Sequence, residues 1–600
     1  MGGMKTCLLL LFAASAVACR AGMPAEYDVL VVGAGPAGIC AATAAGEAGA
    51  RTLLVERDSI SGGATVTSEV NFPGTFHLWG ELQIAGCGWR LVTNAVALAG
   101  GTLPDPKLSN NPVEQWRYHI PVNAPLYAAL AEEMVVKAGV KILYHTMPVA
   151  AVRRDGFWAV RLCCSGEMRE VKVRELVDAT GNGTLAALCG AKREIAPAGR
   201  QPGTFSYRFK VGADLHGVDW AKVRAAYDRA YADGLLLRSD TYSSRGFVPI
   251  KDFVYSGGRH TMYVPDADNS TAEAATDTDM RGRASMLRVY RFLRSVPELG
   301  GVTLTGAAQQ TGVRETYRVV GEHELTAEEY LSGGIGAEAI CYGCYPIDRH
   351  DAENGLRRGF PEKGVVPKVP FGSLVPKGVD HLLVVGRCIS SDRDANSAIR
   401  VQATCMATGQ AAGVAAALAA ESGTTPYRLD LDSVKAVLRA QGAIVPAVAS
   451  RAADAGVKPT ARQLEWADCE IGVIIHQDVQ VYQPFEWRKD PLPGAEVFAP
   501  TALDTDQWIE TAKKAGAKYA VLVAKHCSGF SLWPTKAHDY SVAHSPWKNG
   551  QGDVVADFIA SCRKYGVKPG LYASTGANAY FGVDDAMMRD ETRWNRYLAM

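Results

Sequence analysis

Short apolar runs that alternate with helix-length segments dominate the first part of the chain. Residues 28–32 (DVLVV) form an apolar run, a glycine-rich turn follows at 33–38 (GAGPAG), and the alanine-rich residues 39–48 have the composition of a helix. A second apolar run at 52–55 is followed directly by Glu56. This order of strand, tight turn, helix and strand predicts the first unit of a dinucleotide-binding fold.

The glycines of this turn have separate physical roles. Gly33 permits the tight turn, Gly35 lets the backbone approach a pyrophosphate, and Gly38 lets the helix pack closely on the strand. The helix N-terminus then faces the phosphates, and Glu56 is the expected partner of a ribose hydroxyl. A glycine turn in another kind of α/β protein is the less favoured alternative, because strand, spacing and acidic residue all agree.

The pattern continues along the chain. The further elements that it predicts are a helix at 124–138, strands at 141–144 and 148–153, a hairpin of 157–162 with 171–173, a strand at 176–178, a strand at 381–385, a helix at about 401–420 and a helix at 429–441. Residues 61–65 (SGGAT) form another glycine turn, in which Gly62 and Gly63 bring backbone amides toward the same cofactor. An ordinary loop is the alternative there.

Four separated motifs resemble the FAD-dependent oxidoreductase family related to fumarate reductase flavoproteins. They are, in chain order, 33–38 with Glu56, VDATGNG at 177–183, GVRETYR at 312–318, and LVVGR at 383–387 with GQAAG at 409–413. The resemblance covers about residues 27–442 and implies FAD as the resident cofactor. It also implies that the late Gly-Arg turn lies near the flavin.

Together the turns and the resemblance predict one set of cofactor-binding residues. They are Gly33, Gly35, Pro36, Ala37, Gly38, Glu56, Gly62, Gly63, Ala179, Gly181, Gly386, Arg387 and Gly409.

The substrate side carries a weaker signal. Approximately residues 200–330, within a flavin domain at 24–442, lose the strand–helix rhythm and are expected to form an inserted α+β substrate subdomain. Arg314, Glu315 and Arg318 are the catalytic candidates, since clustered Arg and Glu side chains could position an anionic or hydroxylated substrate. A purely structural ion-pair cluster is the alternative.

The composition changes after residue 442. Residues 443–458 are predicted to be a linker, and strands then alternate with helices at 470–476, 506–515, 519–525, 553–565 and 568–573. Alternation of this kind predicts parallel strands, whose C-terminal ends carry the functional residues of a barrel. His476, Lys525 and His526 lie at those ends.

The second region resembles the family 29 glycoside hydrolases, the α-L-fucosidases. The motifs that carry the resemblance are IIH at 474–476, FAP at 498–500 with 504–508, AGAKY at 515–519, KHCSGF at 525–530, LWP at 532–534, SPW at 545–547 with GDVV at 552–555, and GLY at 570–572. The resemblance implies that the sugar contacts include His476, Lys525, His526 and Trp533. Cys527 and Ser528 stand where the family has His-Asp.

A partial (β/α)8 barrel is therefore expected at 459–600. About three of eight strands are present, whereas a retaining glycosidase needs a nucleophile and an acid on strand ends of one closed barrel. We expect no α-L-fucosidase activity from these 600 residues. The alternative is a carbohydrate-processing protein whose main activity is glycoside hydrolysis or sugar binding by this region. The predicted fold class is thus α/β: a Rossmann-like FAD domain with an insertion, then a partial barrel.

The balance of charges limits the classes of molecule that the protein is expected to bind. Lys plus Arg and Asp plus Glu both number 63, so nothing indicates nucleic acid as a partner, and a small molecule, with carbohydrates among the candidates, is expected. The sequence carries no signal for an oligomeric state.

The 14 cysteines mostly stand singly in apolar tracts, which is typical of buried side chains. Cys341 and Cys344 have motif spacing (CYGC), and a redox dithiol beside the flavin is one interpretation of it. A zinc site needs a second pair, so no metal is expected.

The first 18 residues have the order of a secretory signal peptide: Lys5, an apolar core at 7–14, and Ala16-Val-Ala18. They predict a secreted or periplasmic mature protein. Cys19 follows the expected cut, so a lipoprotein is a second interpretation, although Ala16 replaces the usual larger aliphatic residue. No other run reaches the roughly 18 apolar residues of a membrane span.

Overall fold

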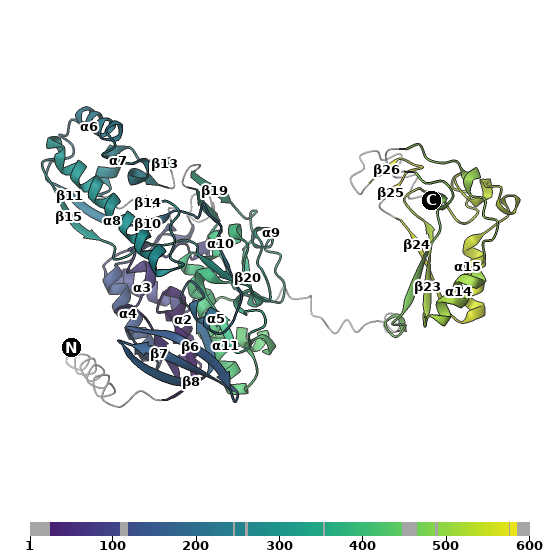
Figure 1. Ribbon diagram of the computed structural model, residues 1–600, viewed down its shortest axis with the longest axis horizontal. Helices are drawn as coiled ribbons and strands as arrows, with labels where there is room; N and C mark the ends of the chain where they lie inside the picture. The colour runs from purple at the N-terminus through teal and green to yellow at the C-terminus, as the bar shows by residue number, and fades with distance from the viewer. Residues whose placement is uncertain are drawn as a thin grey trace. The chain divides into compact units, whose positions relative to one another are not determined.

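Figure 1 shows the computed structural model, which describes residues 25–107, 118–243, 246–257, 262–351, 355–446, 465–485, 490–574 and 577–584. The chain divides into two compact units, residues 1–451 and 452–600. The predicted signal peptide at 1–18, Cys19 and residues 447–458 of the predicted linker lie outside the described residues.

A mostly parallel sheet forms the centre of the first unit. Strand β1 (Glu26–Val32) lies between β2 (Thr52–Val55) and β8 (Glu167–Asp178), and all three run parallel. Strand β5 (Lys141–Leu143) continues the sheet beyond β2, and β21 (Leu382–Val384) pairs with β8. The predicted α/β class is confirmed, since β1, β2 and β21 are apolar runs buried on both faces.

Strand β8 corrects one prediction. The pattern indicated separate strands at 171–173 and 176–178, but the structure has one strand of 12 residues. Its first part pairs antiparallel with β7 (Phe157–Cys164), which also pairs with β6 (Thr146–Arg154), whereas its last residues pair parallel with β1. Its burial changes from alternating to continuous at the same point, because the hairpin has one solvated face and the parallel sheet has none.

Helices pack tightly on this sheet. Helix α2 (Pro36–Glu47) lies against α11 (Gln402–Ser422). A Cβ added at Gly409 would stand 2.1 Å from the carbonyl oxygen of Ala37, and one at Gly413 equally close to that of Ala41. In the described residues α11 is also the one helix long and apolar enough to cross a membrane, but 89% of its apolar window is buried inside the protein, as in a core helix.

The remaining elements of the sheet-bearing part surround this centre. They are β3 (His77–Leu78), β4 (Glu81–Leu82), α3 (Cys87–Leu98), α4 (Ala124–Lys137), α5 (Thr184–Leu188), β9 (Arg193–Ile195), β16 (Tyr317–Val319), α9 (Ala327–Ser332), β17 (Ala339–Tyr342), β18 (Ile347–Asp351), β19 (Gly355–Gly359), β20 (Lys368–Pro370), α10 (Arg393–Ile399) and α12 (Leu431–Ala440). The predicted helices at 124–138, 401–420 and 429–441 thus agree with the structure to within a few residues.

The inserted part has an apolar core of its own. Its elements are β10 (Gly203–Phe205), β11 (Tyr207–Val211), α6 (Trp220–Ala232), β12 (Tyr242–Ser243), β13 (Gly246–Phe247), α7 (Ile250–Tyr255), β14 (Met262–Val264), α8 (Ala272–Ser295) and β15 (Val302–Ala307). Strand β11 pairs antiparallel with β15 and β10 with β14. The core is aromatic, with Tyr207, Tyr227 and Phe253 fully buried. Antiparallel pairs packed on helices give the α+β arrangement that the sequence predicted for this insertion.

The second unit contains a parallel sheet in the order β22 (Gly472–His476), β23 (Tyr519–Lys525) and β24 (Lys568–Ala573). Helices α14 (Thr505–Lys514) and α15 (Val554–Tyr565) pack together, each begun by an aspartate N-cap, Asp504 and Asp553. Strands β25 (Ala577–Asn578) and β26 (Val583–Asp584) form a separate short hairpin. In the part that the structure describes the main sheet has three strands, so the (β/α)8 barrel stays a prediction.

Candidate functional sites

A cleft of about 1300 Å³, its open mouth included, lies at the C-terminal ends of β1, β2 and β8. In an open α/β sheet this edge is where ligands bind. Ten of the predicted cofactor-binding residues line it: Gly33, Gly35, Pro36, Ala37, Glu56, Gly63, Ala179, Gly181, Gly386 and Arg387. The structure therefore brings together residues from four segments, of which the first and last, at Gly33 and Arg387, are more than 350 positions apart in the chain.

The first turn of α2 leaves open space for a phosphate group. Gly35 is the N-cap of α2, with an extended backbone (φ −72°, ψ 179°), and a Cβ added there would meet nothing within 4 Å. Gly33 is left-handed (φ +102°), and a Cβ there would stand 2.6 Å from the carbonyl oxygen of Ala179. The vacant volume beside Gly35 faces a helix N-terminus, which is where a pyrophosphate binds.

Three predicted residues do not line the cleft. Gly38 faces the turn, since its Cβ would stand 1.8 Å from the carbonyl oxygen of Gly33, and Gly409 faces Ala37 of α2. Gly62 adopts φ +121° and would meet the Val66 side chain. These glycines shape the walls of the site through close packing and turn geometry.

Glu56 lines the cleft and also holds its glycine turn. One carboxylate oxygen accepts a hydrogen bond from the Ala34 backbone at 2.6 Å, and the other accepts one from the Asp58 backbone at 3.0 Å. A carboxylate has about four acceptor positions, so it can accept a ribose hydroxyl in addition. The geometry fits the expected ribose contact.

Arg387 joins two walls of the cleft. Its Nε donates to the Gly181 carbonyl at 2.7 Å, Nη1 to the Val313 carbonyl at 2.7 Å, and Nη2 to Asn182 Oδ1 at 2.6 Å. Burial lowers the pKa of Arg387 to about 10, so the group still carries its charge at neutral pH. The Gly181 turn itself is held by the buried Asp178, which accepts from the Thr180 backbone at 2.9 Å.

The three catalytic candidates have different surroundings. Glu315 is buried and paired with Arg393, so it fits the structural alternative. The Arg314 guanidinium lies 5.2 Å from the centre of the Tyr263 ring and donates to the Pro202 carbonyl. Arg318 lies in β16, and its buried Nη1 has no hydrogen-bond partner among the described residues. Arg314 contacts the substrate-side groups described next through Tyr263, and Glu315 is linked to them through Gln201.

The sequence did not predict a buried network beside Arg314. Tyr263 bonds to His350 Nδ1, and His350 Nε2 lies 2.9 Å from Asp348 Oδ2. Arg400 Nη2 donates to the Asp348 carbonyl at 3.1 Å, and Arg400 also lines the cleft. These residues come from β14, β18 and the end of α10, and no motif or spacing links them.

Protonation in this network follows from burial and charge. Burial, with the charge of Arg314, lowers the pKa of His350 to about 4, so its ring is neutral at neutral pH. Burial opposes ionisation of Asp348, but the hydrogen bond from His350 and the nearby cations outweigh it and hold its pKa at about 2. A neutral ring that donates from Nε2 to Asp348 must accept from Tyr263 at Nδ1.

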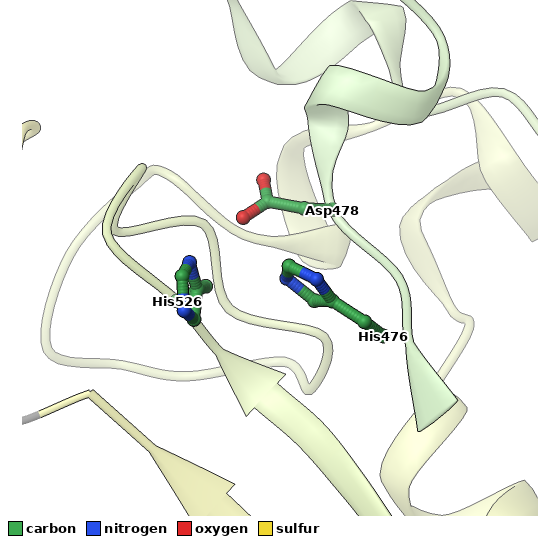
Figure 2. Close-up of side chains that lie close together, drawn as sticks. All are labelled: His476, Asp478 and His526. Carbon is green, nitrogen blue, oxygen red and sulfur yellow. The ribbon is translucent and has the colours of Figure 1, made fainter. Parts of the chain in front are cut away.

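In the second unit two of the predicted sugar-binding residues lie together. Figure 2 shows His476, at the end of β22, facing His526, just after β23, and their ring centres are 4.6 Å apart. Lys525 is buried and donates to the Ser574 carbonyl, and burial lowers its pKa to about 8. Trp533 is half-buried. It is not among the rings described in contact with His526, which are those of His476 and Tyr572.

Asp478 also lies in this cluster, and the sequence did not single it out. Figure 2 shows its carboxylate directed toward the two rings. Oδ2 accepts from Ser528 Oγ at 2.9 Å, so the serine that replaces the family's aspartate contacts an aspartate on the neighbouring strand end. The sequence pattern that could have indicated Asp478 is a carboxylate two residues after a histidine at a strand end. This pattern is too common to predict a functional residue.

The remaining motif, Cys341 and Cys344, has no sign of reactivity. Both thiols are buried and unpaired, and burial raises the pKa of each well above the usual range for cysteine. A reactive cysteine needs a lowered pKa and access to solvent. The structure fits the interpretation as buried small side chains.

The glycine-lined cleft, the helix N-terminus and Glu56 define a dinucleotide-binding flavoprotein. The model of the family described as FAD dependent oxidoreductase matches residues 28–438, and the chain belongs to this family. It binds FAD and is an FAD-dependent oxidoreductase. The model of the alpha-L-fucosidase family matches residues 461–597, so the flavin domain is fused to a fucosidase-like domain, as the sequence predicted.

Individual relatives cover short parts of the chain. An alpha-L-fucosidase of Arabidopsis thaliana is 37% identical over 116 residues, 19% of this chain and 23% of that protein. A nicotine dehydrogenase of Pseudomonas putida is 45% identical over 74 residues, 10% of this chain and 15% of that protein. The crystal structure of a glycoside hydrolase 29 family member from a rumen bacterium is 34% identical, covering 23% of this chain and 25% of that one, with a TM-score of 0.19. The chain spans about a quarter or less of the length of each.

Proposed function

We propose that the flavin domain oxidises or reduces a small anionic substrate, with sugar acids as the carbohydrate-derived class that fits best. The observation that carries this proposal is the state of Arg400. Its side chain lines the cleft, and its buried Nε has no partner among the described residues. Burial, and then the charge of Arg314, lower the pKa of Arg400, while the nearby Asp348 and Glu315 act in the opposite direction.

A carboxylate is the ligand that this arrangement favours. Guanidinium groups bind carboxylates through two parallel hydrogen bonds, and a buried, unpaired donor is costly until it finds an acceptor. The nearby Glu315 does not supply that acceptor, since Arg393 and the Gln201 backbone occupy its carboxylate. Bound FAD would supply hydride transfer, while Arg400 holds the anion in the cleft and the Asp348 carbonyl holds Arg400.

The fused fucosidase-like domain is the reason for choosing a carbohydrate-derived acid among the anionic substrates. No observation favours glycoside hydrolysis as the main activity.

We also propose that the chain is exported, with cleavage after Ala18, from the charged, apolar and small-residue order of residues 1–18. N-terminal sequencing of the protein from cell fractions tests export, and an intact Met1 in the cytosol would refute it.

The substrate class is tested by flavin reduction under anaerobic conditions. Sugar acids and small carboxylates are compared with the matching neutral sugars, and the loss of flavin absorbance is followed. We expect the acids to react, and Arg400→Gln to raise their KM by roughly 10- to 100-fold, the range for a lost hydrogen bond to a charged group. Arg400→Lys should restore part of the loss.

The control is Arg291→Gln on the exposed side of α8, which should leave KM unchanged. Flavin content is measured for every variant, because a loss of FAD would imitate a loss of substrate binding. Equal reaction of neutral sugars, or an unchanged KM for the acids in Arg400→Gln, would contradict an anionic substrate.

A further inference from the structure

The strongest unassigned cluster in the described residues is His476, Asp478 and His526. One potential ligand atom of each residue lies within 4.8 Å of those of the other two. His476 ends β22, Asp478 follows two residues later, and His526 follows β23 directly. The two strands are parallel neighbours, with His476 paired in register with Val523. Figure 2 shows the carboxylate and both rings converging on one space.

The Asp478 carboxylate is held in place by other groups. The Val479 backbone donates to Oδ1 at 2.6 Å, and Ser528 Oγ donates to Oδ2 at 2.9 Å. Carboxylates that bind metals are typically oriented by such additional hydrogen bonds, which leave lone pairs for the ion. The carboxylate is therefore preorganised, while the rings, one exposed and one half-buried, are set beside it.

The Asp478 carboxylate lies outside the ion pairs of the described residues, although it is only 3% exposed. A metal binds imidazole nitrogens and carboxylate oxygens, so the three side chains offer the donor atoms that it requires.

We propose that His476, Asp478 and His526 form a binding site for a divalent transition metal, with zinc as the best match. Two nitrogens and one oxygen are a common three-residue zinc set, which leaves the fourth position for water or another ligand. Zinc bonds of roughly 2.0–2.2 Å place tetrahedral ligand atoms about 3.4 Å apart. The ligand atoms of the three residues lie within 4.8 Å of one another, so they must move only slightly closer together to bind zinc. Rotation of the exposed His476 ring can bring them closer.

This site is independent of the flavin proposal, since all three residues belong to the second unit. It also differs from the sugar contact that the family resemblance implies for the two histidines. Imidazoles that only bind sugar hydroxyls have no need of a buried carboxylate between them. Asp478 is the group that changes the chemistry of the cluster from hydrogen bonding to metal coordination.

The test uses the full 600-residue protein after removal of metals with a chelator. Zinc binding is measured by calorimetry and zinc content by mass spectrometry. Cobalt(II) then serves as a spectroscopic probe, because a tetrahedral site gives it intense visible absorption. We expect one zinc ion per chain at this site, and stabilisation of the second unit against thermal unfolding by added zinc.

Variants separate this site from zinc bound elsewhere, for example by cysteines. Asp478→Asn keeps the side-chain volume but removes the charge, and should weaken zinc binding by more than tenfold and abolish the cobalt spectrum. Ser528→Ala should weaken binding by roughly tenfold, the effect of losing a supporting hydrogen bond. His544→Ala, at an exposed histidine beside Asp539, is the matched control and should change nothing.

Circular dichroism of each variant shows whether it is folded, and His526→Gln offers a second variant if Asp478→Asn is not. Zinc affinity and stoichiometry that are the same in wild type, Asp478→Asn and His526→Gln would overturn the proposal. A second outcome would also overturn it: the wild type gives no cobalt spectrum, and it binds an L-fucoside at His476 and His526 with an affinity that added zinc does not change.

Discussion

Arg393 holds the carboxylate of Glu315 in a two-point ion pair: Arg393 Nε lies 3.0 Å from one oxygen and Nη2 lies 2.5 Å from the other. The carboxylate is 1% exposed and the guanidinium 26% exposed. Burial opposes ionisation of Glu315, but Arg393 and the Gln201 backbone outweigh it and lower the pKa of Glu315. The pair joins the motif at 312–318 to the start of α10, so it stabilises the wall of the cleft rather than contacting substrate.

Removal of this pair should therefore affect stability more than binding. We expect Glu315→Gln to lower the free energy of unfolding by about 3 kcal/mol, because it leaves Arg393 without its partner. Denaturant unfolding of the FAD-loaded protein measures this. Arg224→Gln, which breaks the exposed pair with Asp228, should cost less than about 1 kcal/mol. Similar small effects of both changes would contradict the structural role of Glu315.

Gly35 offers a direct test of the cofactor site. Its extended backbone accepts any residue and its Cβ position is vacant, so Gly35→Val should fold normally. The added side chain would occupy the space in front of α2, and we expect the purified variant to be colourless while the wild type is yellow. Gly336→Val is the control, since Gly336 is exposed and its Cβ position is equally vacant. Full flavin content in Gly35→Val would argue against a pyrophosphate at this turn.

Gly409 tests helix packing separately from cofactor contact. Gly409→Ala would place a Cβ 2.1 Å from the Ala37 carbonyl oxygen, so α11 must move away from α2. We expect a loss of about 1–3 kcal/mol in stability, typical of overpacking. Glu421→Ala, on the exposed end of α11, should stay within about 0.5 kcal/mol of wild type. Thermal unfolding distinguishes the two, and equal stability would mean that this contact is looser than the structure shows.

His350 should make the protein sensitive to mild acid. Its pKa is lowered in the folded state from the ordinary 6.5 to about 4, so the unfolded chain binds more protons between these values. The stability contributed by the neutral ring is thus complete above pH 6.5 and is lost as the pH falls toward 4. Asp348, with a pKa lowered from 3.8 to about 2, adds to the loss only below about pH 4.

The measurement compares wild type with His350→Gln by denaturant unfolding at several pH values. The stability difference between them should shrink as the pH falls from 6.5 to 4, because the unfolded wild-type chain binds a proton at His350 over this range and the glutamine does not titrate. A constant difference for His350→Gln would mean that the ring is already charged or is solvated in the folded protein.

Local patterns predicted many of the sheet strands and long helices, although not the continuity of β8. The strand at 519–525 and the strand at 568–573 match β23 and β24 residue for residue, and the helix at 553–565 differs from α15 by one residue. Side-chain periodicity and N-cap residues act within a few positions, so they can be recognised in the sequence. Gly35, Glu56 and Arg387 could be predicted for the same reason, because turn chemistry and family motifs place them locally.

Tertiary structure decided which distant residues meet. His350 contacts Tyr263 from 87 positions away, Ser528 donates to Asp478 across 50, and Gly409 contacts Ala37 across more than 370. No local pattern carries these pairings, because they depend on how the sheet edges and helices pack after each element has formed. The same packing determines charge state, because burial is the largest cause of the lowered pKa of both His350 and Arg400.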